Sequence, residues 1–100
     1  MNCEHYLIHV QGVTSETLAA LDAGVRKSAR STWHHLDNIW LICVPHGTSY
    51  SGWNNWLTKL VQRDKGLYIF VELGCGQRFN GLLPSGAWHW INAHLHARQY

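Results

Sequence analysis

The sequence predicts one α+β domain in which strands and helices alternate along the chain. Two patterns carry this prediction. Short apolar runs rich in β-branched and aromatic residues end at Gly, Pro, Asp or Asn, as strands do, and the segments between them repeat apolar residues every three or four positions, as helices do. One hundred residues are enough for one such domain with its own core.

The first strand and the first helix are predicted from the N-terminal quarter of the chain. Residues 5–11 (HYLIHVQ) form an apolar run that ends at a glycine, which indicates a strand. From about 15 to 27, apolar residues fall on one helical face, and Thr14 or Ser15 can cap the start of the helix. The domain is therefore expected to begin with a strand and an amphipathic helix.

Residues 33–44 (WHHLDNIWLICV) can be interpreted as a metal-binding or catalytic loop, or as a β-hairpin. The side chains over 29–36 alternate between two sides of an extended chain, and 39–44 is β-branched and aromatic. Asp37 and Asn38 lie between these runs and tolerate turn dihedrals. A hairpin is the simpler interpretation.

The adjacent histidines of this hairpin argue against a metal site. Neighbouring residues of a strand point to opposite faces, so His34 and His35 cannot both bind one metal ion. Asp37 can approach one of them across the turn, but a structural or surface role is favoured for all three. Trp33 and Trp40 are expected to pack on the sheet rather than to stack on bases.

The second helix has the clearest periodic signal in the chain. Thr48 or Ser49 can cap it, and residues 64–66 (DKG) end it. An almost unbroken apolar strand follows over 67–73 (LYIFVEL). The apolar stripe of the helix, at i, i+3, i+4, i+7 and i+8, is Trp53, Trp56, Leu57, Leu60 and Val61.

The remaining residues, about 77–100, are predicted to be a C-terminal extension of a single domain. Residues 83–85 (LPS) resemble a helix start, and Trp88 and Ile91 lie on a third apolar stripe. The order before the extension, β-α-β-β-α-β, is that of the ferredoxin-like sandwich, with a four-stranded antiparallel sheet and two helices on one face. In that arrangement the strands stand in the order 4-1-3-2, and we expect residues 1–100 to form this one domain.

The composition indicates a protein whose surface is partly covered by a partner. Only 14% of the residues are charged and six are tryptophan, so much of the surface is expected to be apolar, and a homodimer is the simplest cover. The net charge is +2, which is too small for a strong nucleic-acid binder.

Three cysteines without CxxC spacing and no signal peptide favour a cytoplasmic, reducing compartment. No apolar run approaches the roughly 20 residues that cross a bilayer, so no membrane contact is expected.

Other candidate sites for metal binding or catalysis give weak signals. His89, His94 and His96 lack the spacing of a zinc motif, so at most adventitious binding of nickel or zinc is expected there. Cys75 lies between two glycines and needs a base beside it to react, and the sequence does not place one. No glycine-rich phosphate-binding spacing occurs. We therefore expect neither a metal nor another cofactor.

Five segments of the chain, taken in order, are YLIHV, RSTWHHLDNIWLI, WLTKL, LYIFVEL and LPSGAWHWI. Together they resemble the small SinR-like proteins, relatives of the CRISPR-associated Cas2 family, over roughly residues 5 to 92. The resemblance implies a ferredoxin-like fold, a symmetric dimer and a link to nucleic acids. Cas2-like proteins carry, at the end of the first strand, an acidic residue proposed to bind a metal for phosphodiester cleavage. This chain has no carboxylate there, since it reads His9, Val10, Gln11 and Gly12.

The sequence therefore favours a non-catalytic, dimeric protein of the Cas2-like or SinR-like type that binds protein or nucleic acid. Arg26, Lys27 and Arg30 form the only basic cluster and are the candidates for phosphate contacts. The alternative is a metal-dependent endoribonuclease or deoxyribonuclease in which Asp37, Asp64 or a histidine replaces the missing carboxylate and holds Mg²⁺ or Mn²⁺.

The predicted dimer interface lies on the strand at 67–73 and on the segment after Gly74. This strand is an edge in the 4-1-3-2 order, and it carries no charge or proline before Glu72 to discourage pairing. Its five successive apolar residues exceed what one helix-covered face requires, so the other face needs a cover, which the tail of the same or the neighbouring subunit can supply. The expected interface residues are Leu67, Ile69, Phe70, Val71, Trp88 and Trp90.

Overall fold

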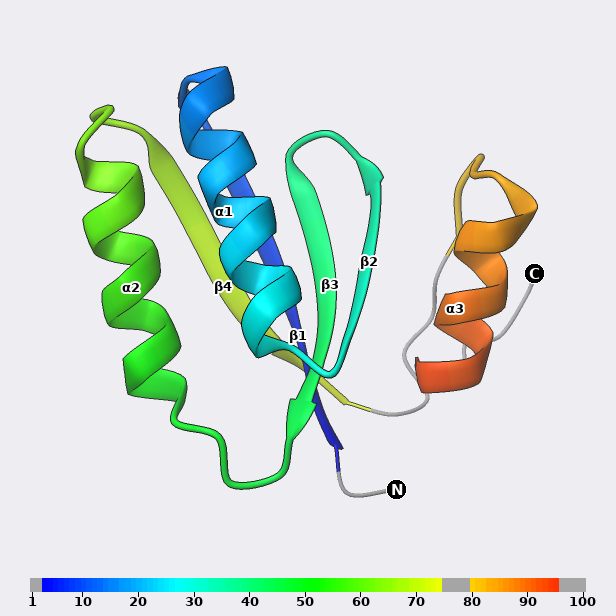
Figure 1. The fold of residues 1–100 in the computed structure, drawn as a ribbon. Helices are drawn as coiled ribbons and strands as arrows, with labels where there is room; N and C mark the ends of the chain where they lie inside the picture. Colours follow the sequence, from blue (N-terminus) through cyan, green and yellow to red (C-terminus); the bar gives the residue numbers. More distant parts are fainter. Residues whose placement is uncertain (1–2, 75–79, 96–100) are drawn as a thin grey trace.

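The described part of the chain, residues 3–74 and 80–95, folds in the computed structural model into a four-stranded antiparallel sheet with three helices (Figure 1). The α+β class is confirmed, and each predicted strand and helix is present. The elements in chain order are β1 (Cys3–Gln11), α1 (Ser15–Ser28), β2 (Ser31–Leu36), β3 (Ile39–Pro45), α2 (Tyr50–Gln62), β4 (Leu67–Leu73) and α3 (Ser85–Leu95).

The sheet is built around β1. This strand pairs antiparallel with both β3 and β4, and β2 pairs antiparallel with β3. The strands therefore stand in the order β2-β3-β1-β4. The predicted hairpin of β2 and β3 is confirmed, and its register shifts between Trp33 and Leu36. β4 lies at one edge of the sheet.

Helices α1 and α2 cover one face of the sheet (Figure 1). Alternate residues of each strand point to this face, so Tyr6, Ile8 and Val10 of β1 are buried beneath the helices. We call this cluster the helix-face core. Its other buried members are Leu21, Val25, Trp40, Ile42, Val44, Trp53, Leu57, Leu60, Val61 and Phe70.

Helix α3 covers part of the opposite face, so the same chain supplies the predicted cover. Trp33 of β2 is buried beneath it, and its indole N–H donates to the carbonyl oxygen of Ala87 at 3.0 Å. Trp90 donates in the same way to Ser31 Oγ at 2.8 Å. We call this cluster the α3-side core, and its buried members are Trp33, Leu41, Ala87, Ile91 and Leu95.

Polar side chains fix the starts of α1 and α2. Thr14 caps α1, and its hydroxyl accepts a hydrogen bond from the backbone N–H of Thr17 at 3.2 Å. Ser49 caps α2 and accepts from the N–H of Gly52 at 3.0 Å. The Asp64 carboxylate accepts from the N–H of Thr14 at 2.9 Å and so ties the end of α2 to the start of α1. Both caps are among the residues predicted for them.

Candidate functional site

Three apolar side chains of β4 lie exposed on the sheet face opposite α1 and α2. Leu67 is 68% exposed, Ile69 is 54% exposed and Val71 is 39% exposed. We call these three residues the β4 strip. A contiguous apolar patch on an edge strand is typical of a surface that another molecule covers. The residues paired with the strip on β1 are Gln11, His9 and Leu7.

The strip is exposed because α3 covers only part of its face. The α3-side core includes Trp33 of β2 and Leu41 of β3, and on β4 it is contacted by Leu73 at the strand's end. Phe70 points the other way, since alternate side chains of a strand change face. It is 7% exposed and lies against Tyr6, with ring centroids 4.9 Å apart. Phe70 therefore belongs to the helix-face core and not to the exposed surface.

The two tryptophans predicted for the interface pack within their own chain. Trp88 and Trp90 are half-buried and lie against the α3-side core. Trp90 also stacks on His94, with ring centroids 4.1 Å apart. The segment predicted to follow Gly74 into the interface, residues 75–79, lies outside the described residues. Among the predicted interface residues, the exposed ones are the β4 strip.

The Tyr50 side chain contacts both the backbone and a side chain of β4. Its hydroxyl donates to the carbonyl oxygen of Phe70 at 2.9 Å, and its ring stacks on the Phe70 ring with centroids 4.7 Å apart. A strand that paired along this edge would compete with that hydrogen bond. The side chains of the β4 strip, rather than the backbone edge, are therefore the surface that a partner can cover without rearrangement.

The aspartates predicted for a nuclease lie in different surroundings. Asp37 is exposed in the turn between β2 and β3. The carboxylate of Asp64 accepts from the N–H of Thr14 at 2.9 Å and from its hydroxyl at 3.2 Å. Hydrogen bonds from Thr17 and Thr14 hold the pKa of Asp64 below its ordinary value. The cluster of potential metal ligands found among the described residues contains neither aspartate.

The paired histidines of the hairpin point to opposite faces, as the alternation predicts. His34 stacks on Trp40 at 4.1 Å between ring centroids and 2° between ring planes. The ring of His35 lies 5.2 Å from that of Trp33. Trp33 is 3% exposed and Trp40 is fully buried, which confirms that both tryptophans pack on the sheet.

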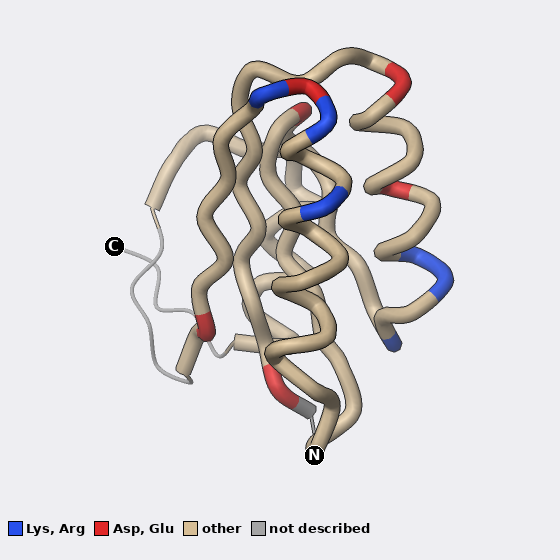
Figure 2. Tube along the Cα trace, turned by 90° about the vertical axis from the view of Figure 1, so that its left-hand side faces the viewer, with Lys and Arg blue, Asp and Glu red and all other residues tan. Residues whose placement is uncertain are grey.

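The described basic residues lie at two separate places on the helical layer, the end of α1 and the end of α2 (Figure 2). Arg26, Lys27 and Arg30 are at the end of α1. Arg26 is held by Asp22, whose carboxylate lies 3.0 Å from its Nε. Acidic residues also interrupt the second group, where Asp64 lies between two basic neighbours. The structure therefore presents two small basic groups and no continuous basic stripe over the described residues.

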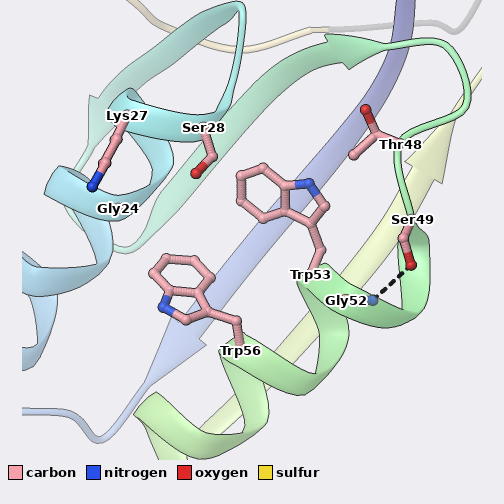
Figure 3. A pocket seen from close by; sticks show the side chains of 8 residues that line it. All are labelled: Gly24, Lys27, Ser28, Thr48, Ser49, Gly52, Trp53 and Trp56. Atoms are coloured by element: carbon pink, nitrogen blue, oxygen red, sulfur yellow. Dashed lines mark hydrogen bonds between the residues drawn. The ribbon is translucent and has the colours of Figure 1, made fainter.

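A groove of about 430 Å³ lies between α1 and α2 (Figure 3). Trp53 and Trp56 line it from α2, with ring planes at 83°, and Lys27 lines it from α1. Gly24 allows this close approach, because a Cβ there would lie 2.4 Å from the Trp56 ring. None of the buried polar atoms without a partner in the described residues lines the groove. It therefore gives no indication of a specific ligand.

A cluster that the sequence analysis did not predict lies beneath α3. One potential ligand atom from each of His5, Cys43 and His94 lies within 4.8 Å of the other two. His5 of β1 is directly opposite Cys43 of β3, and His94 belongs to the last turn of α3. His5 is 7% exposed and Cys43 is 1% exposed. We call these residues the His-Cys-His cluster.

The surroundings of this cluster are aromatic, and two of its three residues are buried. The His94 ring stacks on Trp90 at 4.1 Å and meets the His5 ring edge-on at 5.6 Å. Burial lowers the pKa of His94 below its ordinary value of 6.5, which favours the neutral imidazole. The Nδ1 atom of His94 is buried and has no hydrogen-bond partner within the described residues. Cys43 is disulfide-bonded, which the sequence analysis did not predict.

Part of the signal for this cluster was present in the sequence. His94 was among the candidate ligands, but its predicted companion His89 is exposed on another side of α3. His5 and Cys43 share a face by strand alternation, yet their register depends on which strands pair. The packing of α3 on the sheet, which brings His94 to them, has no local sequence signal.

Two of the earlier candidates, Cys75 and His96, lie outside the described residues. Within the described ranges, none of the helices combines the length and the apolar character needed to cross a membrane. No protein-family model, curated protein or solved structure matches this chain. Its function must therefore be argued from its own residues.

Proposed function

We propose that the chain is a non-catalytic protein of the Cas2-like or SinR-like type, with the ferredoxin-like arrangement, that forms a two-fold dimer and acts by binding protein or nucleic acid. The observation that carries the dimer is the β4 strip. Its three side chains are 68%, 54% and 39% exposed in the monomer. Each Å² of apolar surface that a partner removes from water contributes roughly 25 cal/mol.

A second copy of the chain fits this surface better than a charged partner does. The strip is uncharged, so two copies brought together by a two-fold axis do not repel each other there. His9 and Gln11 lie beside it on β1 and supply polar atoms at its border. An apolar centre with a polar border is the usual composition of a protein interface.

The mass of the protein in solution tests the dimer. Light scattering at micromolar concentration is expected to give twice the chain mass of 11.5 kDa. Ile69→Lys places a charge at the centre of the strip and is expected to shift the mass toward that of the monomer. Leu82→Lys is the matched control, because Leu82 is fully exposed and lies outside the strip. A monomer at every concentration, or an equal effect of both variants, would contradict the proposal.

Binding to nucleic acid is expected to be weak and sensitive to salt. Arg26, Lys27 and Arg30 offer three phosphate contacts, which correspond to a slope of about −2.7 in log K against log salt concentration on duplex DNA. Arg26 has to leave Asp22 to make its contact. Fluorescence anisotropy with a labelled duplex at several salt concentrations measures the slope. Tight binding that is unchanged between low and moderate salt would exclude this basic group as the contact.

The nuclease alternative is separated from this proposal by a cleavage assay. Labelled RNA and DNA are incubated with the protein in Mg²⁺ or Mn²⁺ and are expected to remain intact. Asp37→Ala is the informative variant, because Asp64→Ala would also remove the hydrogen bonds to Thr14. Cleavage by the wild-type protein that disappears in Asp37→Ala protein would replace the proposal with the nuclease alternative.

A further inference from the structure

The His-Cys-His cluster has the donors and the spacing of a zinc site. In a tetrahedral zinc site, Zn–N bonds of about 2.0–2.1 Å and a Zn–S bond of about 2.3 Å place neighbouring ligand atoms about 3.3–3.6 Å apart. The three potential ligand atoms here already lie within 4.8 Å of one another. Shifts of about 1 Å, which side-chain rotation can supply, would bring them to the ligand spacing.

The scaffold around the three donors holds them in place before any ion binds. His5 and Cys43 are directly paired across two central strands, so their separation is set by the sheet. His94 is fixed by its stack on Trp90, whose indole N–H is bonded to Ser31 Oγ at 2.8 Å. Donors on rigid elements lose little conformational freedom on binding, which favours a specific site over adventitious binding.

The oxidation state of Cys43 decides whether the donors can act together. Only a thiolate sulfur is a good zinc ligand, and Cys43 is disulfide-bonded in the structure. A reductant that gives two electrons to the disulfide breaks the S–S bond, and each sulfur then takes one proton to become a thiol. The Cys43 thiol loses its proton when it binds the ion, as metal binding to cysteine requires.

We propose that the reduced protein binds one Zn²⁺ ion through His5, Cys43 and His94, and that the disulfide at Cys43 closes this site. One thiolate and two imidazoles form a mixed sulfur and nitrogen set of the kind that zinc accepts. The ion ties the last turn of α3 to β1 and β3. Metal binding is therefore expected to cross-link α3 to the sheet when the disulfide is reduced.

The test compares metal binding by the oxidised and the reduced wild-type protein. A phosphine is the reductant, because it breaks disulfides by taking oxygen from water to form its oxide and, unlike a dithiol, offers no thiolate to the metal. Circular dichroism first checks that the reduced protein is folded. The reduced protein is expected to bind one equivalent of Zn²⁺, and the oxidised protein is expected to bind it more than about 100-fold more weakly, since even outer partners of a metal ligand change affinity by about 10–100-fold.

Co²⁺ in place of Zn²⁺ identifies the ligands. The reduced protein is expected to show a thiolate-to-cobalt charge-transfer band and the visible bands of a tetrahedral site. Cys43→Ser is expected to abolish the charge-transfer band, and His94→Ala to weaken binding by more than about 100-fold. His89→Ala is the control, since His89 is an exposed histidine on the same helix. It is expected to leave binding unchanged.

Three outcomes would overturn the proposal. Equal affinity of the oxidised and reduced proteins would show that the Cys43 sulfur is not a ligand. Equal losses in His94→Ala and His89→Ala would show adventitious binding by surface histidines. A zinc equivalent without a cobalt charge-transfer band would place the ion elsewhere. The dimer test by light scattering does not depend on any of these results, so failure of the zinc site and failure of the proposed function are distinguishable.

Discussion

The two faces of the sheet differ in how completely helices cover them. Two helices cover one face, where the buried side chains reach from Val44 on β3 to Phe70 on β4. On the other face, α3 packs with Trp33 and Leu41 and leaves the β4 strip exposed to solvent. Both candidate features of this protein, the β4 strip and the His-Cys-His cluster, lie on the partly covered face. We call the face covered by α1 and α2 the sealed face, and its buried side chains are expected to contribute most of the stability. The partly covered face leaves apolar side chains exposed that a partner can contact.

The largest difference between the faces is expected in the loss of stability when a leucine on each face is replaced by alanine. Leu57 of α2 is fully buried in the helix-face core, so Leu57→Ala removes methyl groups, leaves a cavity and should lower the free energy of unfolding by about 2–5 kcal/mol. Leu67 is 68% exposed, so Leu67→Ala should change monomer stability by less than about 0.5 kcal/mol. Urea unfolding of a monomeric background such as Ile69→Lys measures both. Equal midpoints would remove the contrast between the faces.

The sealed face could be predicted from the sequence in more detail than the other one. Strand alternation and helical periodicity identify Leu57, Leu60 and Val61 as buried, because a helix that packs on a sheet must turn its apolar stripe inward. β4 begins and ends where its apolar run does. Trp56 is an exception within the predicted stripe, since it is only half-buried at the groove beside Gly24.

The partly covered face could be predicted only in outline. Five consecutive apolar residues on β4 show that its second face is apolar, but nothing local shows how far α3 extends over it. For the same reason the sequence does not show that Trp88 and Trp90 pack on the sheet of their own chain. The docking position of a helix depends on contacts between segments distant in sequence, so periodicity carries no information about it. The His-Cys-His cluster is a product of that docking.

A smaller difference between the faces is expected in the pH dependence of two hydrogen bonds, each donated by a buried indole on one face. The Trp40 N–H donates to the Asp22 carboxylate at 3.0 Å, whereas the Trp33 N–H donates to the backbone oxygen of Ala87. Burial alone would raise the pKa of Asp22, but hydrogen bonds from Trp40 and Arg26 outweigh it and hold the pKa below the ordinary 3.8. The bond on the sealed face is therefore charged and sensitive to pH, and the bond on the other face is not.

The sign of that pH dependence follows from the direction of the shift. A carboxyl group whose pKa is lowered by folding adds stability above its unfolded pKa, and this stability is lost as the pH falls through the folded value. Asp22→Asn keeps an acceptor for Trp40 but loses the charge, and at pH 7 it should cost about 0.5–1.5 kcal/mol. Chemical denaturation from pH 6 to pH 2 should show the gap between wild type and variant narrowing below about pH 4. A constant gap would mean that the charge of Asp22 does not stabilise the fold.

The smallest effect is expected at Asn54, where the structure revises a prediction from periodicity. Asn54 lies off the apolar stripe of α2, so the sequence predicts that alanine is tolerated there, as at Lys59. The side-chain oxygen of Asn54 in fact accepts a hydrogen bond from the Tyr68 hydroxyl at 2.5 Å, across to β4.

Asn54→Ala should therefore lower the free energy of unfolding by about 0.5–1.5 kcal/mol, toward the low end because Tyr68 keeps its bond to Thr58. Lys59→Ala should change it by less than about 0.5 kcal/mol, since the side chain of Lys59 is exposed and is not among the buried residues of α2. Urea midpoints of the two variants test this difference, and Tyr68→Phe, alone and combined with Asn54→Ala, completes a double-mutant cycle that measures the energy of the Asn54–Tyr68 pair. If Asn54→Ala and Lys59→Ala unfold at the same midpoint, the bond between α2 and β4 contributes nothing, and the helix-face core alone seals that face.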